Sequence, residues 1–67
     1  MKIGRRIKEY CDSHVITHRE FADLAGVSEA TVSLLTQTEK LPDVDDIKRI
    51  AFAFHCSASD LLAEHFR

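Results

Sequence analysis

Four histidines and two cysteines carry the side chains of this chain that bind metal ions most readily. Cys11, His14 and His18 form one group, and His55 and Cys56 form another. Neither group has the C-x-x-C or H-E-x-x-H spacing that directs several ligands at one ion. Cys11 also falls on an apolar stripe, where a free cysteine acts as a small hydrophobic residue. We therefore predict structural or surface roles for these residues, with no metal and no cofactor.

Residues for catalysis are equally sparse. The sequence has no glycine-rich phosphate loop, no G-x-S-x-G and no long loop that would form a pocket. The acidic group of Asp43, Asp45 and Asp46 is better explained by capping a helix and by the positive end of its dipole than by metal binding. We predict that the chain is not an enzyme.

Length and composition indicate one small globular domain over residues 1–67. Apolar residues make up 45% and charged residues 30%, which is typical of a folded chain. No run approaches the ~20 apolar residues of a membrane span, and MKIGRRIKEY has no signal-peptide core. We expect a cytoplasmic protein with free thiols and no membrane contact. A chain this short buries only roughly 60% of its unfolded surface, so dimerisation would help to stabilise it.

The net charge of −2 is unevenly distributed. Residues 1–19 carry +3 and residues 20–67 carry −5, and no basic residue lies between Arg19 and Lys40. A basic end on an acidic remainder suits a protein that contacts phosphate along one edge. An ordinary mixed surface is the alternative.

Apolar residues at helical spacing predict an all-α fold. The expected helices cover about residues 2–13, 18–25, 29–36, 43–54 and 58–65. The fourth is expected to bury Val44, Ile47, Ile50, Ala51 and Phe54. Phe52 points away from that stripe.

The stretch from Thr17 to Gln37 predicts two short helices joined by a tight turn. Thr17 can cap the first helix and form a capping box with Glu20. Phe21, Ala22, Leu24 and Ala25 supply its apolar face. Gly26 can end that helix in the left-handed conformation, and Ser28 can cap the next. The gap is too short for antiparallel helices, so they should cross steeply. This is a helix-turn-helix, whose second helix lies in a DNA major groove.

The outward positions of that second helix are expected to be Glu29, Ala30, Ser33, Leu34 and Gln37. Glutamate can accept from cytosine N4, and alanine or leucine can contact a thymine methyl group. Serine and glutamine can hydrogen-bond to bases or phosphates. For Leu34 the alternative is contact with a protein partner.

Three motifs in the right order carry a family resemblance. They are I-T-H-R-E-F-A-D-L-A-G-V-S-E-A-T-V-S, then Pro42 with I-K-R-I-A-F-A-F, then S-A-S-D-L-L. From Ile3 to Leu62 the chain resembles the Cro and lambda-repressor-like helix-turn-helix family of bacterial and phage regulators, also called the xenobiotic-response-element family. The resemblance implies a five-helix domain, a two-fold homodimer and a short palindromic operator.

The resemblance also implies roles for individual residues. The family's base-reading positions fall on Glu29, Ala30, Ser33 and Leu34. Its phosphate-contacting glutamine falls on His18, and its backbone or capping positions fall on Ser28 and Thr31. The resemblance and the residue types together predict contacts with the DNA backbone by Arg6, Thr17, His18, Arg19, Ser28, Thr31, Gln37 and Lys40. Arg5 and Arg6 could both flank the DNA backbone, and the alternative for them is a solvated surface that contacts no DNA. The alternative for Ser28 is that it only caps the helix.

Three departures from the family pattern stand out. The family usually pairs an arginine at the position of Cys11 with an acid at that of Thr36. Both partners are absent here, which is coherent because either charge buried alone would be destabilising. The family's glycine at position 38 is replaced by threonine, so residues 38–42 are expected to follow a different path.

The leading expectation is a Cro-like transcriptional regulator, a repressor in function, that binds double-stranded DNA as a homodimer through Leu62 and Phe66. The alternative is a protein-interaction module such as an antirepressor or antitoxin subunit. The acidic recognition face and the apolar residues Leu34, Phe52 and Phe66 would then bind a protein partner.

Overall fold

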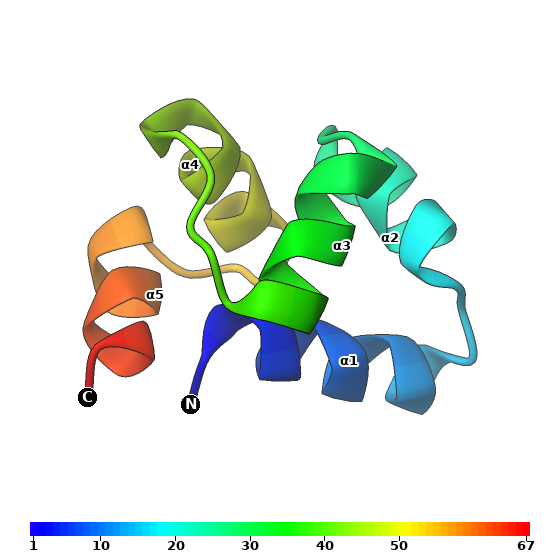
Figure 1. Cartoon of the computed structure of the whole chain (residues 1–67), viewed down its shortest axis with the longest axis horizontal. Coiled ribbons are helices and arrows are strands. Elements are labelled where there is room, and N and C mark those ends of the chain that lie inside the picture. Colours follow the sequence, from blue (N-terminus) through cyan, green and yellow to red (C-terminus); the bar gives the residue numbers. More distant parts are fainter.

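The computed structural model describes all 67 residues and contains five α-helices and no strand. They are α1 (Ile3–His14), α2 (His18–Ala25), α3 (Glu29–Thr38), α4 (Val44–Ala53) and α5 (Ala58–His65). Figure 1 shows α3 in the middle of the molecule, α1 along one edge, and both chain ends close together. The predicted all-α fold is confirmed. No helix combines the length and apolar character that crossing a membrane requires.

Helix boundaries differ from the sequence prediction at three of the five helices. The helix α1 lies one residue later than predicted, at Ile3–His14, and α4 is shorter, at Val44–Ala53. The helix α3 was expected to end near residue 36 but continues to Thr38, whose hydroxyl donates to the Leu34 carbonyl at 2.6 Å. The left-handed residue that ends α3 is Glu39, with φ 60°. Position 38, where the family has glycine, is therefore still helical here, and the left-handed position after it is occupied by a glutamate.

Side-chain caps start four of the five helices, and those at Thr17, Ser28 and Asp43 are as predicted above. The side chains of Thr17, Ser28, Asp43 and Ser57 each accept from the backbone N–H three residues on. Such caps satisfy amides that have no partner inside the helix. The first helix has no cap of this kind, because its N-cap residue is Lys2.

The core is a single cluster of apolar side chains from all five helices. Its members are Ile3, Ile7, Cys11, Phe21, Ala22, Ala25, Val32, Leu35, Ile47, Ile50, Ala51 and Leu61. Three residues expected on inward faces are not part of it: Phe54 is only partly buried and packs against the cluster, and Leu24 and Val44 are each 66% exposed. Neither Leu24 nor Val44 is buried as predicted. Leu24 and Val44 lie at the edge of a helical stripe where no other helix covers them. Phe52 is exposed, as predicted.

The two positions where the resemblance predicts an ion pair are buried as neutral groups. Cys11 lies in the core with its Sγ 3.9 Å from the Thr17 carbonyl oxygen. Burial raises the pKa of the Cys11 thiol, and the nearby carboxylates of Asp12 and Glu20 raise it further. The Thr36 hydroxyl donates to the Val32 carbonyl at 2.9 Å. No buried side-chain nitrogen or oxygen lacks a partner, so the joint loss of both charges leaves no unpaired group.

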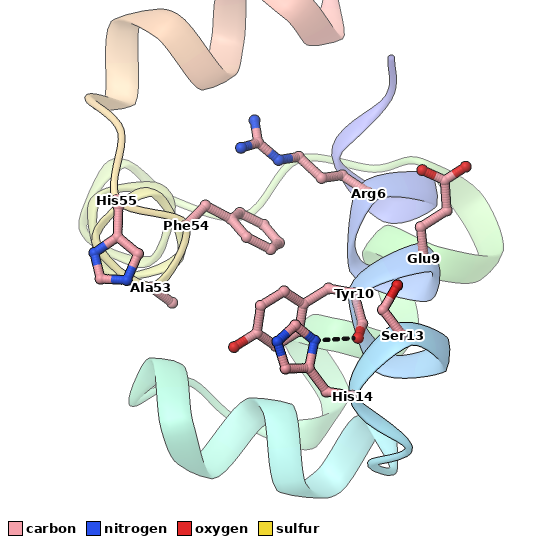
Figure 2. A pocket seen from close by; sticks show the side chains of 8 residues that line it. All are labelled: Arg6, Glu9, Tyr10, Ser13, His14, Ala53, Phe54 and His55. Carbon is pink, nitrogen blue, oxygen red and sulfur yellow. Dashed lines mark hydrogen bonds between the residues drawn. The ribbon is translucent and has the colours of Figure 1, made fainter.

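An aromatic cluster joins α1, α2 and the end of α4, and Figure 2 shows its members Tyr10 and Phe54. The rings of Tyr10, Phe21 and Phe54 pack with all three pairs of centroids 5.5 Å apart. His14 stacks on Tyr10 at 4.0 Å, and the Arg6 guanidinium lies 4.6 Å from the centre of the Phe54 ring. Geometries of this kind stabilise beyond the area they bury.

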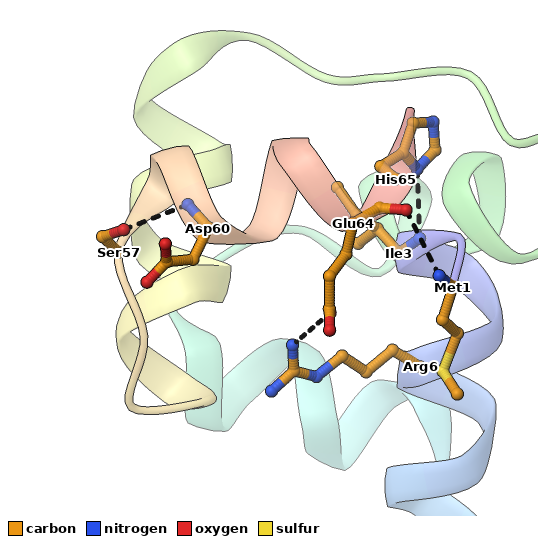
Figure 3. A network of polar contacts seen from close by, with 7 residues as sticks. All are labelled: Met1, Ile3, Arg6, Ser57, Asp60, Glu64 and His65. Carbon is orange, nitrogen blue, oxygen red and sulfur yellow. Dashed lines mark hydrogen bonds and ion pairs between the residues drawn. The ribbon is translucent and has the colours of Figure 1, made fainter. Parts of the chain in front are cut away.

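Polar contacts join the two ends of the chain (Figure 3). The Met1 amino group donates to the Glu64 carbonyl at 3.2 Å, and Arg6 pairs with the Glu64 carboxylate at 3.0 Å. The backbone N–H of Ile3 donates to Nδ1 of His65 at 3.1 Å. The chain start and the first turn of α1 are therefore held against α5 by three contacts.

Candidate nucleic-acid interface

The helix pair α2–α3 is built by local contacts that fix the turn between them. Thr17 Oγ1 accepts from the Glu20 N–H at 3.1 Å while Glu20 Oε1 accepts from the Thr17 N–H at 3.0 Å. At the other end Gly26 takes φ 76°, and its N–H and that of Val27 both donate to the Ala22 carbonyl. This left-handed glycine ends α2 without steric strain. The third helix then leaves at an angle to α2 instead of running back along it (Figure 1).

The start of α3 is fixed by Ser28. Its Oγ accepts from the Thr31 N–H at 3.1 Å and lies 2.9 Å from the Thr31 hydroxyl. The capping role of Ser28 is therefore confirmed, while its contact with phosphate stays a prediction. Both hydroxyls lie at the positive end of the α3 dipole, which favours an anion.

The outer face of α3 is uncovered. Glu29, Ala30 and Gln37 are exposed, Leu34 is 48% exposed, and Ser33 is half-buried. On the opposite side Val32, Leu35 and Thr36 are buried. Three of the four residues predicted to contact bases, Glu29, Ala30 and Leu34, are therefore exposed, and only Ser33 is partly covered, so most of this face is free to enter a groove.

Most residues predicted to contact the DNA backbone lie at the ends of α2 and α3. Thr17, Arg19 and Lys40 are exposed, and His18 and Thr31 are half-buried. Arg6 is placed differently: its guanidinium reaches Glu64 on α5 and the Phe54 ring at the end of α4. Because these contacts already engage Arg6, we leave it out of the interface proposed below.

Two features beside α3 were missed by sequence reasoning. Gly4 lets α1 approach so closely that a Cβ there would overlap the Leu35 carbonyl of α3. Lys2, Arg5 and Lys8 then line a hollow next to the end of α3. A glycine inside a helical pattern, and basic residues repeating every three positions, were the available signals.

A cleft of about 410 Å³ between α1 and the end of α4 contains two of the histidines (Figure 2). His14 stacks on Tyr10 and its Nδ1 lies 2.9 Å from the Tyr10 carbonyl oxygen, while His55 lies on the other wall. Cys11 is buried in the core. No three His, Cys, Asp or Glu side chains lie close enough to hold a metal ion.

Comparison with known proteins identifies the family. No individual curated protein and no solved structure matches the chain. The family model of the Cro/C1-type helix-turn-helix DNA-binding domain matches residues 6–63, which include the whole of the α2–α3 unit. With the exposed outer face of α3, this match shows that the chain belongs to the family of Cro/C1-type helix-turn-helix DNA-binding domains.

Proposed function

We propose that this protein is a sequence-specific transcriptional regulator, a Cro-like repressor of phage or bacterial type. It acts in the cytoplasm as a homodimer on a palindromic operator and represses by occupying DNA that polymerase needs. Residues 1–67 serve as a single DNA-binding domain. The observation that carries the proposal is the uncovered outer face of α3, held at an angle by the Gly26 turn in a chain of this family.

In this proposal α3 enters the major groove with its N-terminal half against the bases. The carboxylate of Glu29 accepts from cytosine N4, and the methyl group of Ala30 contacts thymine. Ser33 and Leu34, one turn further on, reach the next base pairs. Phosphates are contacted by Thr17, His18, Arg19, Ser28, Thr31, Gln37 and Lys40.

Binding to DNA is tested with the purified chain and a pool of random-sequence duplexes. We expect one palindromic sequence to be enriched over successive rounds, with half-sites about one helical turn apart. No retention of any duplex at low salt would contradict the proposal.

Alanine substitutions separate base contacts from phosphate contacts. We expect Glu29→Ala and Ser33→Ala each to lower the preference for the selected operator over random DNA by about tenfold, because a lost base contact costs about 1–3 kcal/mol. Lys40→Ala should weaken binding to both duplexes alike, since phosphates carry no sequence information. Titration of each variant against both duplexes measures the ratio. The same change of preference in all three variants would reject this division of roles.

The homodimer is proposed to form through α5. Its outer face carries Ser59, Leu62, Ala63 and Phe66 at i, i+3, i+4 and i+7, a stripe without charge. Phe66 is 69% exposed, and Leu62 is only partly covered by the core. An uncharged helical stripe of small and large side chains suits packing against its own copy around a two-fold axis.

Two exposed phenylalanines provide a matched test of this interface. We expect Phe66→Ser on the α5 stripe to raise the dimer dissociation constant by at least about tenfold, since each buried phenylalanine contributes about 1.5–3 kcal/mol. Phe52→Ser on α4 removes an equally large exposed ring and should leave dimerisation unchanged. Sedimentation equilibrium measures both. A larger effect of Phe52→Ser would place the interface on α4 instead.

The second candidate function is a protein-interaction module, such as an antirepressor or an antitoxin subunit. It is favoured by the absence of lysine and arginine from α3 and by the exposure of Leu34 and Phe52. If no duplex is retained at low salt, this alternative gains support.

A further inference from the structure

The hollow next to the end of α3 has a basic wall that the proposed interface does not use. It measures about 450 Å³ and is lined by Lys2, Arg5 and Lys8 from the start of α1 and by Leu35, Thr36 and Glu39 from the end of α3. We call Lys2, Arg5 and Lys8 the basic strip. All three side chains are exposed. The strip holds three of the nine lysines and arginines of a chain whose net charge is −2.

The strip lies against the C-terminal half of α3 because of Gly4. The missing side chain at Gly4 brings α1 into contact with the backbone of Leu35 and Thr36. These residues belong to the C-terminal half of α3, and Glu39, which also lines the hollow, directly precedes Lys40. The strip therefore lies beside the end of α3 at which Gln37 and Lys40 are proposed to contact phosphates.

The basic strip has few partners within the protein. Lys2 and Lys8 form no ion pair. Arg5 lies 3.7 Å from Glu9, and both side chains are more than half exposed, so this pair contributes little. Arg6 on the same helix is different, because Glu64 neutralises it. Within the hollow, Glu39 is the one residue whose charge would repel an anion.

From this placement we infer that the basic strip is a second phosphate-contacting surface, which binds the DNA backbone alongside α3 without regard to sequence. The inference rests on the proposed DNA-binding function. It explains how a recognition helix with no lysine or arginine can stay bound, since cations on a neighbouring helix supply the attraction. The competing structural reading is that the three cations only offset the negative end of the α3 dipole.

The test uses the full chain and a random-sequence duplex, because phosphate contacts do not require the operator. We expect Lys2→Gln and Lys8→Gln each to weaken binding about fivefold to tenfold at about 0.1 M salt and to reduce the slope of log affinity against log salt by about one. Lys48→Gln on α4 removes the same charge away from the strip and serves as the control. Glu39→Gln should strengthen binding, which loss of folding cannot imitate.

Each outcome decides the inference. Wild-type slopes for Lys2→Gln and Lys8→Gln, with no gain from Glu39→Gln, would overturn it while leaving the proposed function intact. An effect of Lys48→Gln equal to that of the strip variants would overturn it as well, because net charge would then be sufficient. If the wild-type chain binds no duplex at low salt, the proposed function and the strip fail together.

Discussion

Replacing Gly4 with alanine is expected to lower the free energy of unfolding by about 3 kcal/mol, enough to unfold much of a chain this small. A Cβ at this position would overlap the Leu35 carbonyl oxygen and lie 2.7 Å from the Leu35 carbonyl carbon and 3.0 Å from Thr36 Cα. All three atoms belong to the backbone of α3, so no side chain can rotate away. The helices would have to separate, which opens space around Ile3 and Ile7 in the core.

The helix propensity of alanine would by itself raise the stability of the Gly4→Ala variant, so the sign of the measured change shows whether the clash is present. Alanine favours a helix interior over glycine by about 1 kcal/mol, so a variant without the clash would be more stable than wild type. Urea unfolding followed by circular dichroism measures the difference. Gly26→Ala is the matched control: its φ of 76° strains alanine, but the nearest atom to the new Cβ is Arg49 Cδ at 3.8 Å. We expect it to lose only about 1–2 kcal/mol. A Gly4→Ala variant as stable as wild type would refute the close contact.

Features set by neighbouring residues were predictable from the sequence. The capping box of Thr17 and Glu20, the left-handed Gly26 and the caps at Ser28 and Asp43 each involve residues at most five positions apart. Residue type and spacing determine such contacts without knowledge of the rest of the fold. The α2–α3 unit, and with it the exposure of the predicted base-contacting residues, followed from them.

Features that depend on distant parts of the chain were not predictable. Apolar spacing places Leu24 and Val44 near a buried stripe, but only the packed structure reveals that no helix covers them. Gly4 looks like any glycine in a helix until α3 is placed against it. Arg6 and Glu64 are 58 positions apart in the sequence, so the pairing that engages Arg6 within the protein has no local signal.

His65 forms another of these long-range contacts, which leads to a prediction on pH. The first helix lacks a side-chain cap of its own, and Nδ1 of His65, 62 positions away, accepts the Ile3 N–H at 3.1 Å instead. The side chain is 4% exposed. Burial lowers the pKa of His65 below its ordinary 6.5, the charges of Lys2 and the Met1 amino group lower it further, and Glu39 opposes them.

Acid is therefore expected to destabilise the fold through this residue. A proton on Nδ1 removes the acceptor for the Ile3 N–H and places a buried cation at the positive end of α1. Because the unfolded chain binds this proton more readily than the folded one, the free energy of unfolding should fall as pH decreases below 6.5 and level off below the folded-state pKa. At higher pH the contribution is fully present.

Three histidine variants test this contribution by urea unfolding at about pH 7.5 and about pH 5. We expect His65→Ala to lose about 2–3 kcal/mol at the higher pH, since it removes a buried hydrogen bond and leaves a cavity. That deficit relative to wild type should shrink in acid, where wild type loses the contribution too. His65→Asn keeps a neutral acceptor near the position of Nδ1, so it should retain more stability than alanine and lack this pH dependence. His55→Ala removes an exposed histidine and should follow wild type at both pH values. A deficit of His65→Ala that is the same at both pH values would show that the imidazole contributes packing alone.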